Sequence, residues 1–280
     1  SLLFVGGGSA KINVYRFDKT SGAVTFLSST STPGASPTFL AIHAKKKLLF
    51  AADENGGLIK AYAIDTATGT LKFLNEVLSP GGPAHVAVDA AGKWVFSAGY
   101  GNGHVASFPV LADGTLGGAT SDLLAGRNAH QALVSPSGAQ VWVPCLGSNY
   151  IAQYTLAAGN LTPANPATVA TGSSGPRHLA AHANGKWVYL FNETGSSVQK
   201  FDFDGSNLKI TGSAVSSLPA PVSGNTGSEI QIHPNGKYVY GANRGDDSIA
   251  VFAVGETGDL TRQKNVKTGG KSPRHFAVDT

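Results

Sequence analysis

The sequence has little charge, a single cysteine and no long apolar run, and each shortage excludes a class of protein. Only 14% of the 280 residues are charged and the net charge is +4, which is too small an excess to favour a nucleic-acid partner. Cys145 has no second cysteine with which to form an intrachain disulfide, and because it lies in an apolar run we expect a buried structural thiol. No run approaches the roughly 18 apolar residues that a helix needs to cross a bilayer, so we expect no membrane partner.

Glycine, by contrast, is abundant and regularly placed, with 36 residues. A glycine turn that precedes an apolar residue recurs every 44 to 53 residues, and the interval that runs through the two chain ends is 44 residues. Because the register survives that passage, the repeat is typical of a ring. The six turn glycines are Gly22, Gly69, Gly114, Gly159, Gly205 and Gly258.

Each repeat has the same internal order of short β-rich runs. Apolar runs such as residues 48–50, 94–96 and 141–143 alternate with turns. Runs with a period of two, cut by turn residues, indicate antiparallel strands, and no segment shows a sustained helical period. Four strands in about 45 residues match one blade of a β-propeller. We therefore predict an all-β fold in a single domain, residues 1–280: a closed β-propeller of six four-stranded blades.

The two chain ends are predicted to share one blade. Residues 272–278 repeat the motif that opens the other blades, whereas the N-terminus begins one strand later. Pairing of residues 272–278 with residues 2–5 would hide strand edges that a ring would otherwise expose.

Candidate functional residues come from three positions at which the aligned repeats differ in chemistry. The first strand of each propeller blade lines the central channel, and the channel entrance is the usual ligand site. Structural repetition needs only small or apolar residues there, yet several are charged or polar. The first aligned position holds Thr38, Ala84, His130, Arg177, Ser228 and Arg274; the second holds Phe39, His85, Gln131, His178, Glu229 and His275; the third holds Gly8, Glu54, Tyr100, Leu146, Glu193 and Arg244.

The first and third positions supply three arginines, carboxylates and one imidazole to one channel entrance. The planar guanidinium groups of Arg177, Arg244 and Arg274 suit carboxylate or phosphate oxygens, so they predict an anionic ligand. His130 shares the first position with two of them and can transfer a proton near neutral pH.

Structural roles compete with this interpretation. Pro-Arg-His occurs twice, so His178 and His275 are also expected as hydrogen-bonded links between blades. A simple ion pair between blades is the alternative for Glu193 and Arg244, and both interpretations stay open for His85. Three further histidines recur near turns and are expected to be structural: His43, His182 and His233.

Metal binding is not expected. Several histidines are present, but no ligand spacing such as His-x-x-x-His supports a metal site.

Over essentially its whole length the chain resembles the bacterial propeller lactonases, the 6-phosphogluconolactonase and carboxymuconate cyclase group. The individual motifs are short, and their order and spacing carry the resemblance. They are residues 82–85 (Gly-Pro-Ala-His), 129–130 (Ala-His), 134–136 (Val-Ser-Pro), 175–178 (Gly-Pro-Arg-His), 191–193 (Phe-Asn-Glu), 243–244 (Asn-Arg) and 273–274 (Pro-Arg).

The resemblance implies a cofactor-free enzyme that acts on a small anionic lactone at the channel entrance. By position, the resemblance implies that His130 is the general base and that Glu193 is an acid/base partner. The anion clamp would be Arg177, Arg244 and Arg274, with His85 and Tyr100 as further substrate contacts.

Alternative functions and one departure from the family remain. The family includes enzymes that hydrolyse a lactone and enzymes that close a muconate lactone. Two further alternatives stay open: a non-catalytic propeller that binds a protein or glycan, and an inactive repeat-deleted form. The departure is that family members normally have seven blades, whereas six repeats are counted here, as though one had been removed after Arg274.

We expect a monomer located in the cytoplasm, with an exported form as the alternative.

Overall fold

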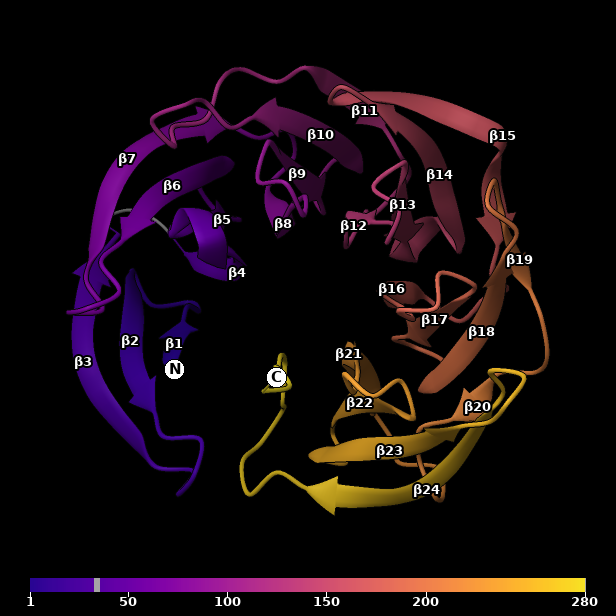
Figure 1. Ribbon diagram of the computed structural model, residues 1–280. Helices are drawn as coiled ribbons and strands as arrows, with labels where there is room; N and C mark the ends of the chain where they lie inside the picture. The colour runs from indigo at the N-terminus through magenta and orange to yellow at the C-terminus, as the bar shows by residue number, and fades with distance from the viewer. Residues whose placement is uncertain (33–35, 280) are drawn as a thin grey trace. The chain divides into compact units, whose positions relative to one another are not determined.

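The computed structural model describes residues 1–32 and 36–279, and nearly all regular structure in it is antiparallel β-sheet (Figure 1). The helical content is two 3-10 turns, Ala44–Lys46 and Leu146–Ser148, and no helix in the described part of the chain could cross a membrane. The predicted all-β, six-bladed propeller class is confirmed: the strands form six sheets. The chain divides into two compact units, residues 1–134 with 156–161 and residues 135–155 with 162–280, and each is described by itself.

The first unit holds three sheets, each formed from consecutive strands. In every sheet neighbouring strands pair antiparallel in chain order, as the repeat predicted. The sheets are β1 (Leu2–Val5), β2 (Lys11–Phe17) and β3 (Val24–Ser31); β4 (Pro37–His43), β5 (Leu48–Asp53), β6 (Leu58–Ile64) and β7 (Leu71–Leu78); and β8 (Pro83–Val88), β9 (Trp94–Gly99), β10 (His104–Pro109) and β11 (Ser121–Leu124).

The second unit holds two further sheets and most of the sheet that begins at β12 (Leu133–Val134). In one of them the outermost position is divided between two short strands, β19 and β20, which both pair with β18. The remaining strands are β13 (Gln140–Cys145), β14 (Tyr150–Ala157) and β15 (Asn160–Ala170); β16 (Pro176–Ala181), β17 (Trp187–Asn192), β18 (Ser197–Phe203), β19 (Leu208–Ile210) and β20 (Val215–Ser216); and β21 (Thr226–Ile232), β22 (Tyr238–Arg244), β23 (Ser248–Val254) and β24 (Leu260–Lys267).

Burial differs systematically across each sheet. The second strand of a blade is covered on both faces, and every residue of β5 is buried; the outer strand β7 is largely exposed. This explains why the second strands read as continuous apolar runs rather than alternating ones. In unit 1 Phe50 packs in one cluster with Val95 and Phe108 of the next sheet, and in unit 2 Tyr189 packs in the same way with Phe252.

At Gly159 and Gly258 the repeated turn glycine is explained by packing against the neighbouring sheet. A Cβ atom added to Gly159 would lie 2.2 Å from the ring of Trp94, and one added to Gly258 would lie 2.4 Å from the ring of Trp187. Both glycines also have positive φ angles, 80° and 82°. The backbone of each turn therefore lies directly on the first residue of the preceding blade's second strand, where no side chain fits.

The turn histidines are structural, as predicted. His43 accepts from the Lys46 N–H through Nδ1, so its Nε2 donates to the Ala90 carbonyl of the next sheet at 3.2 Å. His182 repeats the arrangement, with Nε2 3.0 Å from the Gly236 carbonyl. His233 accepts from the Asn235 N–H at 3.2 Å.

Cys145 is also structural. Its side chain is fully buried, and burial raises the pKa of the thiol to about 12. The cysteine is therefore protonated at neutral pH, which is the state expected of an unreactive packing residue.

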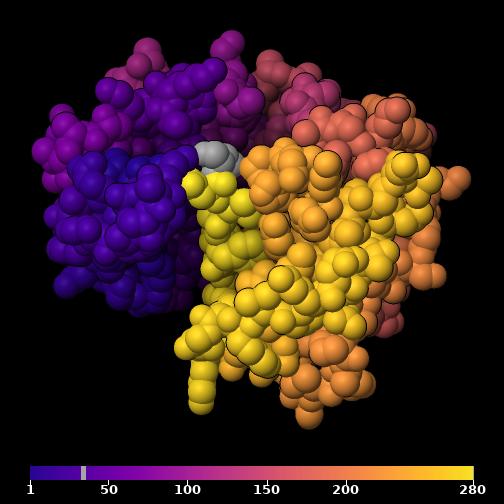
Figure 2. Space-filling view, turned by 60° about the horizontal axis from the view of Figure 1, so that its bottom comes forward, coloured from indigo at the N-terminus to yellow at the C-terminus, as the bar shows by residue number. Residues whose placement is uncertain are grey.

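The prediction that the two ends share a blade is wrong in this structure. The sheet that contains β1 has three strands, and residues 272–278 form no strand. Side-chain contacts with the preceding blade hold the segment instead: the Ser272 N–H donates to Asp247, and Ser228 donates to the Pro273 carbonyl. We call residues 268–279 the C-terminal tail; it lies among the yellow surface residues in Figure 2.

Gly258 and Gly205 provide a matched test of the packing explanation. Both have positive φ angles, but a Cβ at Gly205 would meet nothing within 4 Å. Gly205→Ala should lower the free energy of unfolding by about 1–2 kcal/mol through backbone strain alone. Gly258→Ala should lower the free energy of unfolding by about 1–3 kcal/mol more than Gly205→Ala, because the added methyl group overlaps the Trp187 ring. Urea unfolding of the two variants measures the difference, and equal losses would contradict the packing account.

Candidate functional site

The first aligned position coincides with a β-bulge. Pairing of the innermost strand with its neighbour shifts register at this point in β4, β8, β16 and β21. A bulge leaves one residue without a partner and re-aims its side chain. The alternation of side-chain directions along a strand does not hold through a bulge, so the directions of these side chains do not follow from the period of two. The residues skipped in the ladders are Thr38, Ala84, Arg177, and Ser228 with Glu229.

In unit 2 the bulge of β16 brings Arg177 to a carboxylate that a second arginine shares. Arg177 Nε lies 2.9 Å from Glu193 Oε2, and Arg244 Nη2 lies 3.0 Å from Glu193 Oε1. Glu193 directly follows β17, and its backbone joins two blades: its N–H donates to the Gly175 carbonyl, and its own carbonyl accepts from the Gly227 N–H. We call Arg177, Glu193 and Arg244 the arginine cluster.

The arginine cluster holds more positive than negative charge away from water. The side chain of Arg177 is 3% exposed and that of Glu193 19%. Burial lowers the pKa of Arg177 to about 10, and the charges of Arg244 and Arg274 act in the same direction, so the guanidinium group is protonated at neutral pH. Among the described residues, Arg177 Nη1 and Arg244 Nε are buried without a hydrogen-bond acceptor. Buried donors of this kind call for an anionic partner.

Beside the arginine cluster, a second acid contacts two imidazoles. Glu229 Oε2 lies 3.2 Å from His178 Nδ1 and 3.4 Å from His275 Nε2. This confirms the expected link between blades, since His178 belongs to β16 and Glu229 to β21. Burial, together with the nearby positive charges of Arg177 and other cations, holds the pKa of His178 well below its ordinary value of 6.5.

In unit 1 the structure brings together two other predicted residues, His130 and Tyr100. Their rings meet edge to face, with centroids 5.5 Å apart and planes at 80°. Tyr100 directly follows β9, where its carbonyl accepts from the Asn128 side chain at 3.2 Å. His130 itself is only 4% exposed, so its imidazole is held in a defined orientation by its surroundings.

His85 lies on β8 in the same unit and stacks on Phe39 of β4, with ring centroids 4.2 Å apart. Both residues belong to the second aligned position, as do His178, Glu229 and His275. Within each unit, therefore, side chains at this position contact their counterparts in the neighbouring repeat.

Glu229 was not among the predicted site residues, although it shares the second aligned position with the histidines that it contacts. The signal was present in the alignment: His178, Glu229 and His275 occupy the same position in three consecutive repeats. The predicted residues thus fall into two groups, His130, Tyr100 and His85 in unit 1 and the three arginines with Glu193 in unit 2.

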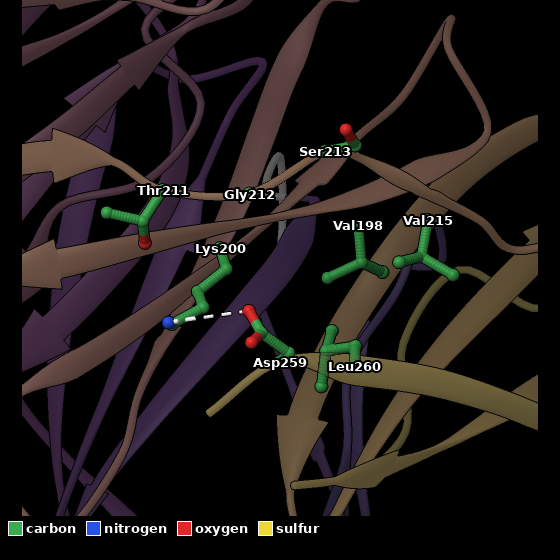
Figure 3. Close-up of a pocket in the computed structure, with 8 residues that line it drawn as sticks. All are labelled: Val198, Lys200, Thr211, Gly212, Ser213, Val215, Asp259 and Leu260. Atoms are coloured by element: carbon green, nitrogen blue, oxygen red, sulfur yellow. Dashed lines mark ion pairs between the residues drawn. The ribbon is translucent and has the colours of Figure 1, made fainter. Parts of the chain in front are cut away.

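A cavity of about 310 Å³ in unit 2 contains none of the predicted site residues (Figure 3). Its only basic side chain, Lys200, already donates to the Thr257 carbonyl at 2.7 Å and lies 3.3 Å from Asp202 and 3.5 Å from Asp259. The charge of Lys200 is thus neutralised within the protein. Across the described ranges 1–32 and 36–279, no three His, Cys, Asp or Glu side chains are arranged to hold a metal ion.

Comparison with known proteins gives one consistent result. Residues 3–280 match the family described as "Lactonase, 7-bladed beta-propeller". A 6-phosphogluconolactonase of Bacillus subtilis is 34% identical over 99% of this chain and 83% of its own length. One of Enterobacter sp. is 31% identical over 97% and 82%, respectively. A periplasmic gluconolactonase of Pseudomonas aeruginosa superimposes with a TM-score of 0.91 at 30% identity, covering 99% of this chain and 86% of that one.

The environment of His178 predicts an acid-dependent loss of stability. Since the folded state holds the pKa of His178 below 6.5, the unfolded chain binds a proton that the folded chain rejects. The stabilisation is present above pH 6.5 and is lost as the pH falls below it, by at most about 1.4 kcal/mol per pH unit for one proton. Urea unfolding between pH 8 and pH 5 should therefore give a shallower pH dependence for His178→Gln than for the wild type. Parallel curves would show that His178 is not the group responsible.

Proposed function

Because the chain belongs to the lactonase family of β-propellers, we propose that it hydrolyses the ester bond of an anionic sugar lactone. The observation that carries the proposal is the arginine cluster, in which two guanidinium groups share one carboxylate and keep buried donors without acceptors. A phosphate or carboxylate group supplies the missing acceptors and the missing negative charge. A site built only to join two blades would need one arginine for one acid.

The proposed reaction is attack of water on the lactone carbonyl. His130 takes a proton from the water as its oxygen bonds to the carbonyl carbon, and the ring oxygen leaves with a proton, giving the open hydroxy acid. In this proposal Glu193 assists the proton transfer, while Arg177, Arg244 and Arg274 bind the anionic group and oppose the developing negative charge. His85 and Tyr100 complete the substrate contacts. No cofactor or metal takes part.

A phosphorylated sugar lactone is the proposed substrate. The similar 6-phosphogluconolactonases are named for such a substrate, and the buried positive charge of the arginine cluster supports it. We further propose that the two units form one propeller domain and that the enzyme is a cytoplasmic monomer. The periplasmic gluconolactonase among the similar structures makes an exported enzyme the alternative location.

The role of His130 is tested by His130→Gln, which keeps a polar side chain of similar length but removes the base. Turnover of 6-phosphogluconolactone should fall at least about 100-fold, because general base catalysis contributes about that much or more. His233→Gln is the control, since the His233 imidazole accepts a hydrogen bond from the Asn235 N–H of its own turn. A screen that includes unphosphorylated aldonolactones and carboxymuconolactone identifies the substrate class. Full activity of His130→Gln on the best substrate would exclude the proposed base.

The anion clamp is tested at Arg274, which is exposed and so is replaced with little risk to folding. Arg274→Ala should raise KM for the phosphorylated lactone about tenfold, because one charge-assisted hydrogen bond is worth about 1.4 kcal/mol or more. KM for the unphosphorylated lactone should change little. Arg262→Ala on the outer strand β24 is the matched control and should affect neither substrate. Equal loss for both lactones in Arg274→Ala would contradict phosphate recognition.

A further inference from the structure

The Pro-Arg-His motif occurs twice in unit 2, and the histidines of both copies contact the same carboxylate oxygen. His178 of residues 176–178 and His275 of residues 273–275 contact Glu229 Oε2 at 3.2 and 3.4 Å. Each histidine directly follows one of the arginines assigned above to the anion clamp. One acid thus links the two chain segments that carry Arg177 and Arg274.

Glu229 is itself held rigidly. It is 2% exposed and lies in the bulge of β21. Its Oε1 accepts from the Ile230 N–H at 3.1 Å and from the Gln231 side chain at 2.9 Å. Because both of these contacts use Oε1, Oε2 remains to receive the two imidazoles. The carboxylate is therefore a fixed point rather than a mobile counter-ion.

The two arginines depend on this fixed point to different degrees. Arg177 is flanked by residues of a strand: Pro176 pairs with Asn192, and His178 pairs with Phe191. Arg274 belongs to the C-terminal tail, which is in no strand. The residues on either side of Arg274 are held by β21, Pro273 through a 2.7 Å hydrogen bond from Ser228 and His275 through Glu229.

We propose that Glu229 is a positioning residue that fixes Arg274 in the geometry that binds the anionic group of the substrate. The inference rests on the proposed function, since it concerns how the clamp is held. It distinguishes Glu229 from an acid that only joins blades. Such an acid affects stability, whereas Glu229 acts on anion affinity through one identifiable arginine.

The test uses Glu229→Gln, which keeps the size of the side chain but replaces one carboxylate oxygen with an amide NH₂ group. Binding of inorganic phosphate, measured by calorimetry, should weaken about tenfold, the value of one charge-assisted contact. KM for the phosphorylated lactone should rise more than kcat falls. Amide hydrogen exchange in peptides covering residues 272–276 should become faster, because the tail loses its contact with β21.

A double-mutant cycle identifies the arginine through which Glu229 acts. In the Arg274→Ala background, Glu229→Gln should have little further effect on phosphate affinity, because contacts that act through the same group are not additive. Additive losses would overturn the link to Arg274. His182→Gln, which removes the inter-blade contact to Gly236, is the structural control; it should lower thermal stability without changing phosphate affinity or tail exchange.

A second variant keeps the inference testable if Glu229→Gln fails to fold. His275 has a side chain that is 48% exposed, so His275→Ala should fold and should reproduce the loss of phosphate affinity and the faster tail exchange. Unchanged phosphate affinity in both variants would overturn the inference even if stability falls. The proposed function would instead be refuted by wild-type protein that neither binds phosphate nor hydrolyses any lactone. In that case the anchoring role would be refuted separately by equally slow hydrogen exchange of the tail in the wild type and in Glu229→Gln.

Discussion

Glu193 lies between two guanidinium groups, and the chemistry of unit 2 depends on the positive charge that this leaves unneutralised. A single carboxylate balances one of the two arginines, so the buried cluster has a net positive charge when empty. Leaving buried charges and donors unpaired is costly, and the fold tolerates this only because neighbouring blades hold the groups in place. The Glu193 backbone is bonded to Gly175 on one side and Gly227 on the other, so the carboxylate cannot move away to relieve the imbalance. An anionic ligand would remove this imbalance.

The repeated blade provides a scaffold on which few positions are available for chemistry. Second strands are buried on both faces, and turn glycines and turn histidines join one blade to the next. What remains is the bulge on the innermost strand and the residue that follows the second strand. Charged residues of the candidate site occupy these places: Arg177 lies in a bulge and Glu193 follows β17. The bulge thus removes Arg177 from the alternation of side chains that packs the sheet.

The sequence predicted the repeat, the strand order and the structural histidines because each depends on local, recurring chemistry. A turn glycine that packs on Trp94 or Trp187 recurs in register, and so it is visible without a structure. The arginines and Glu193 were also predicted, because they interrupt an otherwise apolar pattern. Two features were not predictable in this way. The tail carries the blade-opening motif but is held by side chains of β21 rather than by a strand, and the importance of Glu229 comes from contacts between segments about 50 residues apart, which no local pattern reveals.

We propose that the unneutralised charge of the arginine cluster recognises the phosphate of a sugar acid. Calorimetry that compares 6-phosphogluconate with gluconate, the corresponding hydrolysis products, tests it without requiring turnover. The account predicts at least about tenfold tighter binding of the phosphorylated acid, equivalent to about 1.4 kcal/mol, and a preference that decreases as salt screens the charge. Equal affinity for the two acids, or a preference that is unaffected by salt, would contradict it.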